Sequence, residues 1–117
     1  MRKKNYKGRC EKRTLPKCVG VCRTYDELQA RCAEIISGNP EVRQFRCNVP
    51  LDGDCEGYVT DFVAEKLDGG TMVRECVYRN LLSKPRTISL LDASQRYWYG
   101  KGICDWKIVV GNKEDKL

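Results

Sequence analysis

Two acidic residues occupy positions where a β-strand would normally carry an apolar side chain. Asp61 lies within the run VTDFV (59–63), and Glu75 lies within VRECV (73–77). Side chains alternate between the two faces of a strand, so each acid shares a face with valines. Burying a carboxylate there costs several kcal/mol unless a cation or hydrogen-bond donors compensate.

If the two runs form neighbouring strands, the carboxylates of Asp61 and Glu75 are expected to converge on one divalent metal ion. We also expect this pair to open onto a groove. The alternative is that the face is simply exposed to water, as one face of an antiparallel sheet often is.

Eight cysteines in 117 residues indicate a second candidate metal site. Cys10, Cys18 and Cys22 are spaced as Cys-x7-Cys-x3-Cys, and thiolates are preferred zinc ligands. The chain contains no histidine, so the fourth ligand of a structural zinc would be Cys32, Cys55 or another thiol. The alternative is that these thiols hold no metal. The cysteines inside predicted elements are expected to pack as small hydrophobic residues: Cys32, Cys47, Cys76 and Cys104.

The elements that must position these residues are predicted in the order α-β-β-β-α-β, an α/β class with a mixed sheet. The recurrence of Leu28, Cys32, Ile35 and Ile36 predicts an amphipathic helix from about residue 25 to 38, capped by Thr24 or Asp26. Three strands at 42–49, 58–64 and 71–78 are then expected to form an antiparallel meander. A second helix is expected at 87–99, and a last strand at 106–110 is expected to follow it by a parallel crossover.

The chain is predicted to be one domain at residues 25–110, with an irregular basic arm at 1–24 and a frayed tail at 111–117. Residues 1–23 contain nine Lys or Arg and one acid, whereas the rest of the chain has a net charge of −2. A basic arm on a near-neutral domain is typical of a nucleic-acid-binding protein. We expect it to supply most of the non-specific DNA affinity and to be removable without loss of the fold. The alternative is a solubilising tail.

Several classes of function are disfavoured. No apolar run has the roughly 20 residues of a membrane span, and no apolar stretch follows the basic N-terminus, so we expect a cytoplasmic protein with reduced thiols and no membrane partner. The chain has no P-loop, no dinucleotide fingerprint that would bind a small-molecule cofactor, and no GxSxG motif.

The order of elements, with an acid on the second strand and another on the third, resembles the restriction-endonuclease-like nucleases. From about Tyr25 to Val110 the chain is similar to the N-terminal catalytic domain of the TnsA-like transposon endonucleases. Residues 60–62 (Thr-Asp-Phe) match that family's Pro-Asp-Phe, and Glu75 falls on the first position of its (E/Q)-x-K motif.

The resemblance implies a Mg²⁺- or Mn²⁺-dependent DNA endonuclease that cleaves the ends of a mobile element with a partner transposase or recombinase. Asp61 and Glu75 would bind the metal. A helical glutamate would be Glu27 by position, although one alignment places Gln29 there.

The sequence departs from the family pattern at Val77, where the family has a lysine. Arg79, two residues further along, would then supply a displaced cation. The competing hypothesis, motivated by Val77, is a catalytically inactive nuclease fold that binds nucleic acid or docks a partner.

Overall fold

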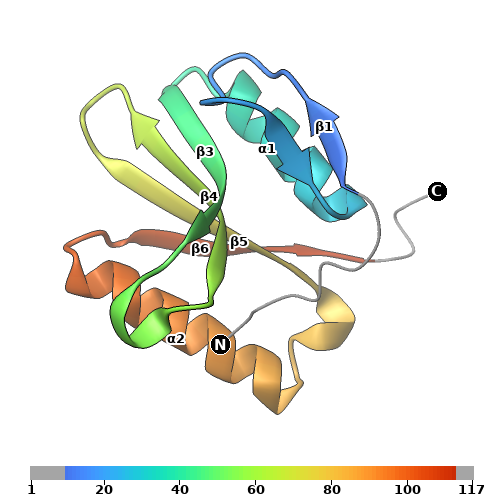
Figure 1. Cartoon of the computed structure of the whole chain (residues 1–117), viewed down its shortest axis with the longest axis vertical. Helices are drawn as coiled ribbons and strands as arrows, with labels where there is room; N and C mark the ends of the chain where they lie inside the picture. The colour runs from blue at the N-terminus through green and yellow to red at the C-terminus, as the bar shows by residue number, and fades with distance from the viewer. Residues whose placement is uncertain (1–9, 113–117) are drawn as a thin grey trace.

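A four-stranded mixed sheet divides the molecule, with α1 on one face and α2 on the other (Figure 1). The computed structural model describes residues 10–112. Its elements follow one another in this order: β1 (Glu11–Arg13), β2 (Cys22–Thr24), α1 (Glu27–Gly38), β3 (Val42–Pro50), η1 (Gly53–Cys55), β4 (Val59–Lys66), β5 (Thr71–Tyr78), η2 (Arg79–Leu81), α2 (Pro85–Gly100) and β6 (Asp105–Gly111), where η1 and η2 are short 3-10 helices.

The sheet has the strand order β3-β4-β5-β6. The first two pairs are antiparallel and the β5–β6 pair is parallel, with α2 in the connection between them. The turn between β4 and β5 uses Gly69 at φ 91°, and the Gly70 N–H donates to the Asp68 carboxylate at 2.8 Å. The predicted α/β class, the element order and the parallel crossover are confirmed.

Helix α1 begins where Asp26 caps it, because the Asp26 carboxylate accepts a hydrogen bond from the Gln29 N–H at 2.7 Å. Its apolar side packs on the sheet through a buried cluster that includes Leu28, Ile36 and Phe62. Ile35, expected on the same side, is instead 69% exposed. The buried stripe is therefore narrower than the periodicity indicates.

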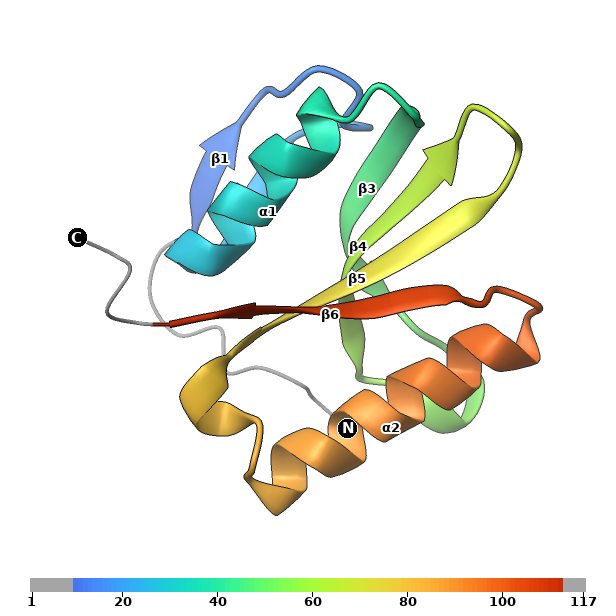
Figure 2. The same ribbon diagram turned by 180° about the vertical axis from the view of Figure 1, so that it is seen from behind.

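Helix α2 covers the opposite face, as Figure 2 shows from behind. Leu90 and Trp98 pack there against Tyr58 and Val73. The Trp98 indole N–H also donates to the Thr60 hydroxyl at 3.1 Å, which satisfies a polar atom that α2 buries.

The prediction of an irregular arm at 1–24 is wrong for its described part. Strands β1 and β2 form a small antiparallel sheet, and the loop between them lies along the edge of β3. The Val19 N–H donates to the Phe45 carbonyl at 2.8 Å, and the Phe45 N–H donates to the Lys17 carbonyl at 2.9 Å. The local composition of this polar segment, which contains Gly20, does not reveal that it docks on the sheet. The hydrogen-bond partners of the segment lie in β3, which follows α1 in the sequence. Residues 1–9 of the predicted arm fall outside the described residues.

The predicted tail also begins later than expected, because Gly111 is the last residue of β6 and pairs with Tyr78. Among the described residues, no helix is long and apolar enough to cross a membrane.

Candidate functional site

Strands β4 and β5 separate at the two predicted acids. Their ladder pairs run from Glu65↔Thr71 to Phe62↔Arg74 and end there, and the two ribbons diverge beyond that point (Figures 1 and 2). The outer pairs continue, because β3–β4 extends to Val59 and β5–β6 extends to Gly111. The sheet is thus split between its two central strands.

The two carboxylates bridge this split. The Asp61 N–H donates to Glu75 Oε1 at 3.1 Å, and the Cys76 N–H donates to Asp61 Oδ2 at 2.7 Å. Each acid therefore accepts a main-chain hydrogen bond from the neighbouring strand. Side-chain oxygens occupy the positions that main-chain carbonyls would take in a continuous ladder.

Helix α1 contributes Gln29 to this site. Gln29 Nε2 donates to Asp61 Oδ1 at 3.1 Å and to Asn48 Oδ1 at 3.0 Å. The Gln29 Oε1 atom accepts from the Tyr25 N–H at 2.8 Å. These three bonds fix the orientation of the amide, so that it presents its donor to Asp61.

Helix α2 contributes Ser94 from the opposite side. The Ser94 hydroxyl donates to Glu75 Oε2 at 2.7 Å and accepts from the Trp106 indole N–H at 3.0 Å. Because the indole can only donate, the serine proton is directed to the carboxylate. The two helices therefore reach the split from opposite faces of the sheet, each through one polar side chain.

All four side chains of this network are fully buried: Gln29, Asp61, Glu75 and Ser94 each have an exposed fraction of 0%. The prediction that the acids lie on adjacent antiparallel strands is confirmed. The expected groove is not open at the pair, because neither carboxylate is exposed. Burying two carboxylates is costly, and the hydrogen bonds given above offset part of that cost.

The structure places the other predicted site residues away from the pair. Glu27 is exposed in the first turn of α1, and Gln29 is the side chain of that helix that contacts Asp61. Strand β5 ends at Tyr78, so Arg79 lies in η2 and does not continue the strand face. Its Nε donates to Asn112 at 3.1 Å.

A second cluster consists of three thiols. The sulfur atoms of Cys18, Cys22 and Cys47 all lie within 4.8 Å of one another, close enough to hold one metal ion. The predicted set of Cys10, Cys18 and Cys22 is therefore correct for two members only. Cys10 precedes β1, which places it at the opposite end of the β1–β2 pair from Cys22.

The candidate fourth ligands are not part of this cluster. Cys32 is buried within the apolar core beneath α1, and Cys55 is buried on the other side of the sheet, where its sulfur contacts the Ala93 carbonyl.

Cys104, expected to pack as a small hydrophobic residue, is instead exposed. Cys47 does pack against the apolar core as expected, but Cys47 also takes part in the thiol cluster. It shares a strand face with Phe45, and the docked β1–β2 segment brings Cys18 from the loop and Cys22 from β2 to that face.

The thiols affect one another electrostatically. Burial, followed by the neighbouring Cys47 and Cys18, raises the pKa of Cys22 to about 12. Burial and the Cys47 thiol also raise the pKa of Cys18. Without a cation, Cys18 and Cys22 therefore favour the neutral thiol at neutral pH.

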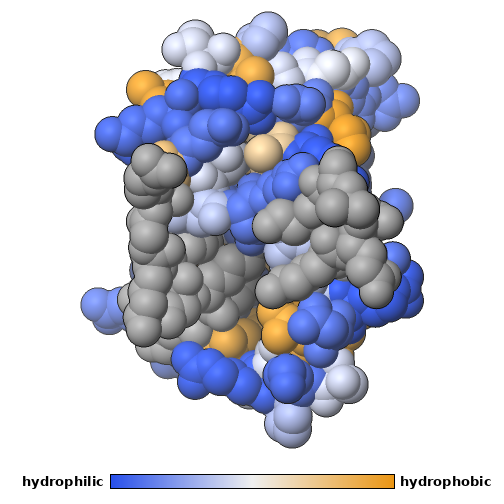
Figure 3. Space-filling view, turned by 90° about the vertical axis from the view of Figure 1, so that its right-hand side faces the viewer, coloured by the Kyte–Doolittle hydropathy of each residue, from blue (hydrophilic) through white to orange (hydrophobic). Residues whose placement is uncertain are grey.

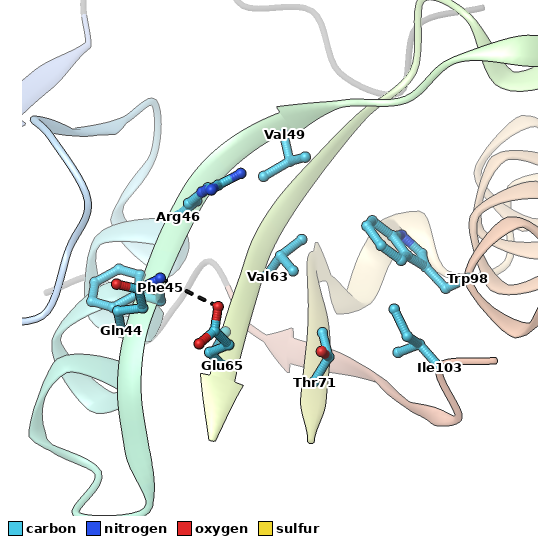
Figure 4. A pocket seen from close by; sticks show the side chains of 10 residues that line it. Gln44, Phe45, Arg46, Val49, Val63, Glu65, Thr71, Trp98 and Ile103 are labelled. Atoms are coloured by element: carbon cyan, nitrogen blue, oxygen red, sulfur yellow. Dashed lines mark hydrogen bonds between the residues drawn. The ribbon is translucent and has the colours of Figure 1, made fainter. Parts of the chain in front are cut away.

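A shallow groove of about 280 Å³ lies between the sheet and the C-terminal end of α2 (Figure 4). Val49, Val63, Trp98 and Ile103 form its apolar part, and Arg46 lies at its rim. The groove includes neither acid of the buried pair.

Figure 3 views the molecule from the side where β5 runs into η2. Most of the described surface on this face is hydrophilic, with only scattered apolar side chains. Of the bases of the predicted arm that the structure describes, Lys12 and Arg23 are exposed, whereas Arg13 pairs with Glu34 and Lys17 donates to the Asn39 carbonyl.

Neither a scan against protein-family models nor a search of curated proteins gave a match. Ser94 and Asn48 were not predicted from the sequence as members of the site. Ser94 lies among the polar residues of a helix, and no local pattern marks it as the one that faces a carboxylate. Gln29 carried a signal, since it is a polar residue beside Leu28 at the buried side of α1.

Proposed function

We propose that this protein is a divalent-metal-dependent DNA endonuclease, similar to the TnsA-like enzymes of mobile elements, that acts with a partner transposase or recombinase. The observation that supports this function best is the placement of Asp61 and Glu75 at the split between two antiparallel strands, where each carboxylate accepts a backbone hydrogen bond from the other strand. Acids on consecutive strands, with a side chain from the first helix beside them, are also what the resemblance to restriction-endonuclease-like nucleases implies.

The donor set suits a hard cation. Carboxylate oxygens are the ligands that Mg²⁺ and Mn²⁺ prefer, and thiolates are not. Asp61 and Glu75 would hold the ion, which when bound stabilises charge on the phosphate and lowers the pKa of an attacking water. The thiols of Cys18, Cys22 and Cys47 are instead suited to zinc.

Gln29 and Ser94 are positioning residues in this proposal. Each is held by a second partner, the Tyr25 N–H for Gln29 and the Trp106 indole for Ser94, and each directs a proton at one carboxylate oxygen. In this orientation the Gln29 amide is a donor to Asp61 and not a metal ligand.

Access to the pair requires movement, because both carboxylates are fully buried. The split in the sheet provides a physical route. Beyond Phe62 and Arg74 the two halves of the sheet are joined through side chains instead of ladder bonds. Opening them there breaks few main-chain hydrogen bonds, whereas β3–β4 and β5–β6 stay paired.

A nuclease must also bind the DNA backbone, and the excess positive charge of residues 1–23 is suited to that role. Lys12 and Arg23 are the exposed bases of this segment among the described residues. Contacts from such side chains are independent of DNA sequence and weaken as salt rises.

A second candidate is an inactive nuclease fold that binds DNA or a partner. Val77 supports it, because this buried aliphatic side chain stands where the related family has lysine. Arg79, the nearest candidate replacement on the chain, is engaged by Asn112.

A plasmid-nicking assay separates the two candidates. Supercoiled DNA is incubated with Mg²⁺ or Mn²⁺ and the wild-type protein, the Asp61→Asn variant or the Glu65→Gln variant. Glu65 is an exposed acid on the same strand and serves as the matched control. We expect nicking by wild type and Glu65→Gln only.

Two outcomes would count against endonuclease activity. Equal nicking by Asp61→Asn would assign the activity to a contaminant. Salt-sensitive DNA binding without nicking by the wild type, and without any heat on titration with Mn²⁺, would favour the inactive module.

A further inference from the structure

We propose that Cys18, Cys22 and Cys47 form a zinc site with three thiolate ligands, which fastens the loop between β1 and β2 to the edge of the sheet. This site is separate from the carboxylate pair and does not depend on the proposed nuclease function. The fold of the loop, its docking on β3 and the chemistry of the sulfur atoms each support it.

The loop and the start of β2 bring two thiols together. Cys18 and Cys22 flank Gly20, which adopts φ 78°, a conformation that residues with a side chain rarely adopt. Lys17 also lies in the left-handed region at φ 72°. For a lysine this conformation costs on the order of 1 kcal/mol and persists where the surroundings impose it.

The docking of the loop supplies the third thiol. The hydrogen bonds between Val19, Lys17 and Phe45 align the loop with β3. Further along β3, the Asn48 amide donates to the Arg23 carbonyl at 2.7 Å. Cys47 lies between these two attachment points, so its sulfur comes close to those of Cys18 and Cys22.

The spacing of the sulfur atoms fits tetrahedral zinc. With Zn–S bonds of about 2.3 Å, two sulfur ligands of one ion lie roughly 3.8 Å apart. The observed upper limit of 4.8 Å therefore needs only a small inward movement. No further His, Cys, Asp or Glu among residues 10–112 joins the group, so the fourth position is assigned to a water molecule.

The environment of the sulfurs is that of metal ligands. The Arg23 N–H donates to Cys47 Sγ at 3.4 Å, and such an N–H···S bond stabilises a thiolate that binds a metal. Cys22 is fully buried, whereas Cys18 and Cys47 are half-buried and give the ion a way in. Three neighbouring thiolates repel one another, and a divalent cation that accepts soft ligands removes that repulsion.

The test uses the full chain, purified with a reductant, stripped by a chelator and then titrated with Zn²⁺ or Co²⁺. We expect about one ion per chain and the intense visible absorption of tetrahedral cobalt with thiolate ligands. The variants Cys18→Ser and Cys47→Ser are expected to lose both signals. Cys104→Ser removes an exposed thiol outside the cluster and is expected to retain them.

A thermal melt tests the structural role. Zinc is expected to raise the melting temperature of wild type and Cys104→Ser but not of Cys18→Ser or Cys47→Ser. Circular dichroism checks that the serine variants fold. If they do not fold, the number of metal ions bound per chain and the cobalt spectrum of the wild type test the proposal. Absence of stoichiometric metal in wild type, retention of it by both serine variants, or a disulfide between any two of these cysteines would overturn the proposal.

Discussion

Glu75 accepts a hydrogen bond from the backbone N–H of Asp61 at 3.1 Å, and the Asp61 carboxylate accepts one from the N–H of Cys76, the residue after Glu75. The two acids thus hold β4 and β5 together where the ladder has ended. The same two carboxylates therefore link the strands and are the proposed ligands of the metal ion. Changes to this network are therefore expected to alter stability and metal binding together.

Gln29 is predicted to contribute strongly to stability. Gln29→Ala removes the donor to Asp61 and the acceptor for the Tyr25 N–H inside a fully buried network, which is expected to cost about 2–3 kcal/mol. Glu27→Ala, an exposed substitution two residues earlier in the same helix, is expected to change stability by less than about 0.5 kcal/mol. Urea denaturation measures both. Equal effects of the two variants would show that the Gln29 network is not stabilising.

Gln29→Glu is predicted to couple stability to metal. A third carboxyl beside Asp61 adds like-charge repulsion to the metal-free protein, and a divalent cation relieves it. We expect a lower melting temperature without metal and a larger rise on adding Mn²⁺ than in wild type. Gln44→Glu, which places the same change beside the exposed Glu65, is the matched control. A Mn²⁺ response of Gln44→Glu as large as that of Gln29→Glu would contradict this prediction.

Asp105 is predicted to contribute stability that depends on pH. Burial raises the pKa of Asp105, but hydrogen bonds and charge interactions with Lys66 and Arg74 outweigh burial and hold the pKa below its ordinary value of 3.8. A depressed pKa in the folded state stabilises the protein above pH 3.8, and that stability is lost as pH falls through the folded-state pKa. Asp105→Asn should therefore be less stable than wild type at pH 7, with a difference that disappears in strong acid. Denaturation measured from about pH 2 to 7 checks this, and a constant difference would refute it.

The exposed bases of the N-terminal segment are predicted to bind DNA phosphates. Replacing Lys12 and Arg23 with glutamine should flatten the slope of log K against log[salt] by about 0.9 for each duplex phosphate that is no longer neutralised. The control replaces Arg31 and Lys107, exposed bases outside this segment. Titrations at several salt concentrations measure the slope. An equal change in the control would indicate a diffuse charge effect.

Removing residues 1–23 entirely is predicted to lower the melting temperature, contrary to the expectation from composition. That truncation deletes β1, the docked loop and the fully buried Cys22. The point substitutions at Lys12 and Arg23 should leave the melting temperature unchanged, which a thermal melt of the three proteins verifies. A truncated chain that melts like wild type would show that the loop adds no stability.

The elements that could be predicted well are those with local signals. Strong periodicity, the Asp26 cap and the Asp68-Gly69 turn located α1 and the meander to within a few residues, because each signal acts over one turn or one hairpin. Asp61 and Glu75 were found because an acid among valines is costly wherever the strand packs.

The rest depended on contacts between distant segments. Cys47 joins Cys18 and Cys22 only through the docking of a loop on β3, and Ser94 meets Glu75 only through the position of α2 on the sheet. The prediction that Arg79 shares a strand face with Val77 is wrong, because it assumes that side chains continue to alternate beyond Tyr78, where β5 ends. No pattern within a single segment encodes these relationships.

Calorimetric titration with Mn²⁺ of protein that holds one equivalent of zinc tests the central claim most directly. One equivalent of zinc occupies the thiols and leaves the carboxylates free of zinc, so the heat reports on the carboxylate pair. We predict one Mn²⁺ site per chain in wild type and Glu65→Gln, and none in Asp61→Asn or Glu75→Gln. Mn²⁺ binding that is the same in all four proteins, or absent from the wild type, would contradict a metal site at Asp61 and Glu75.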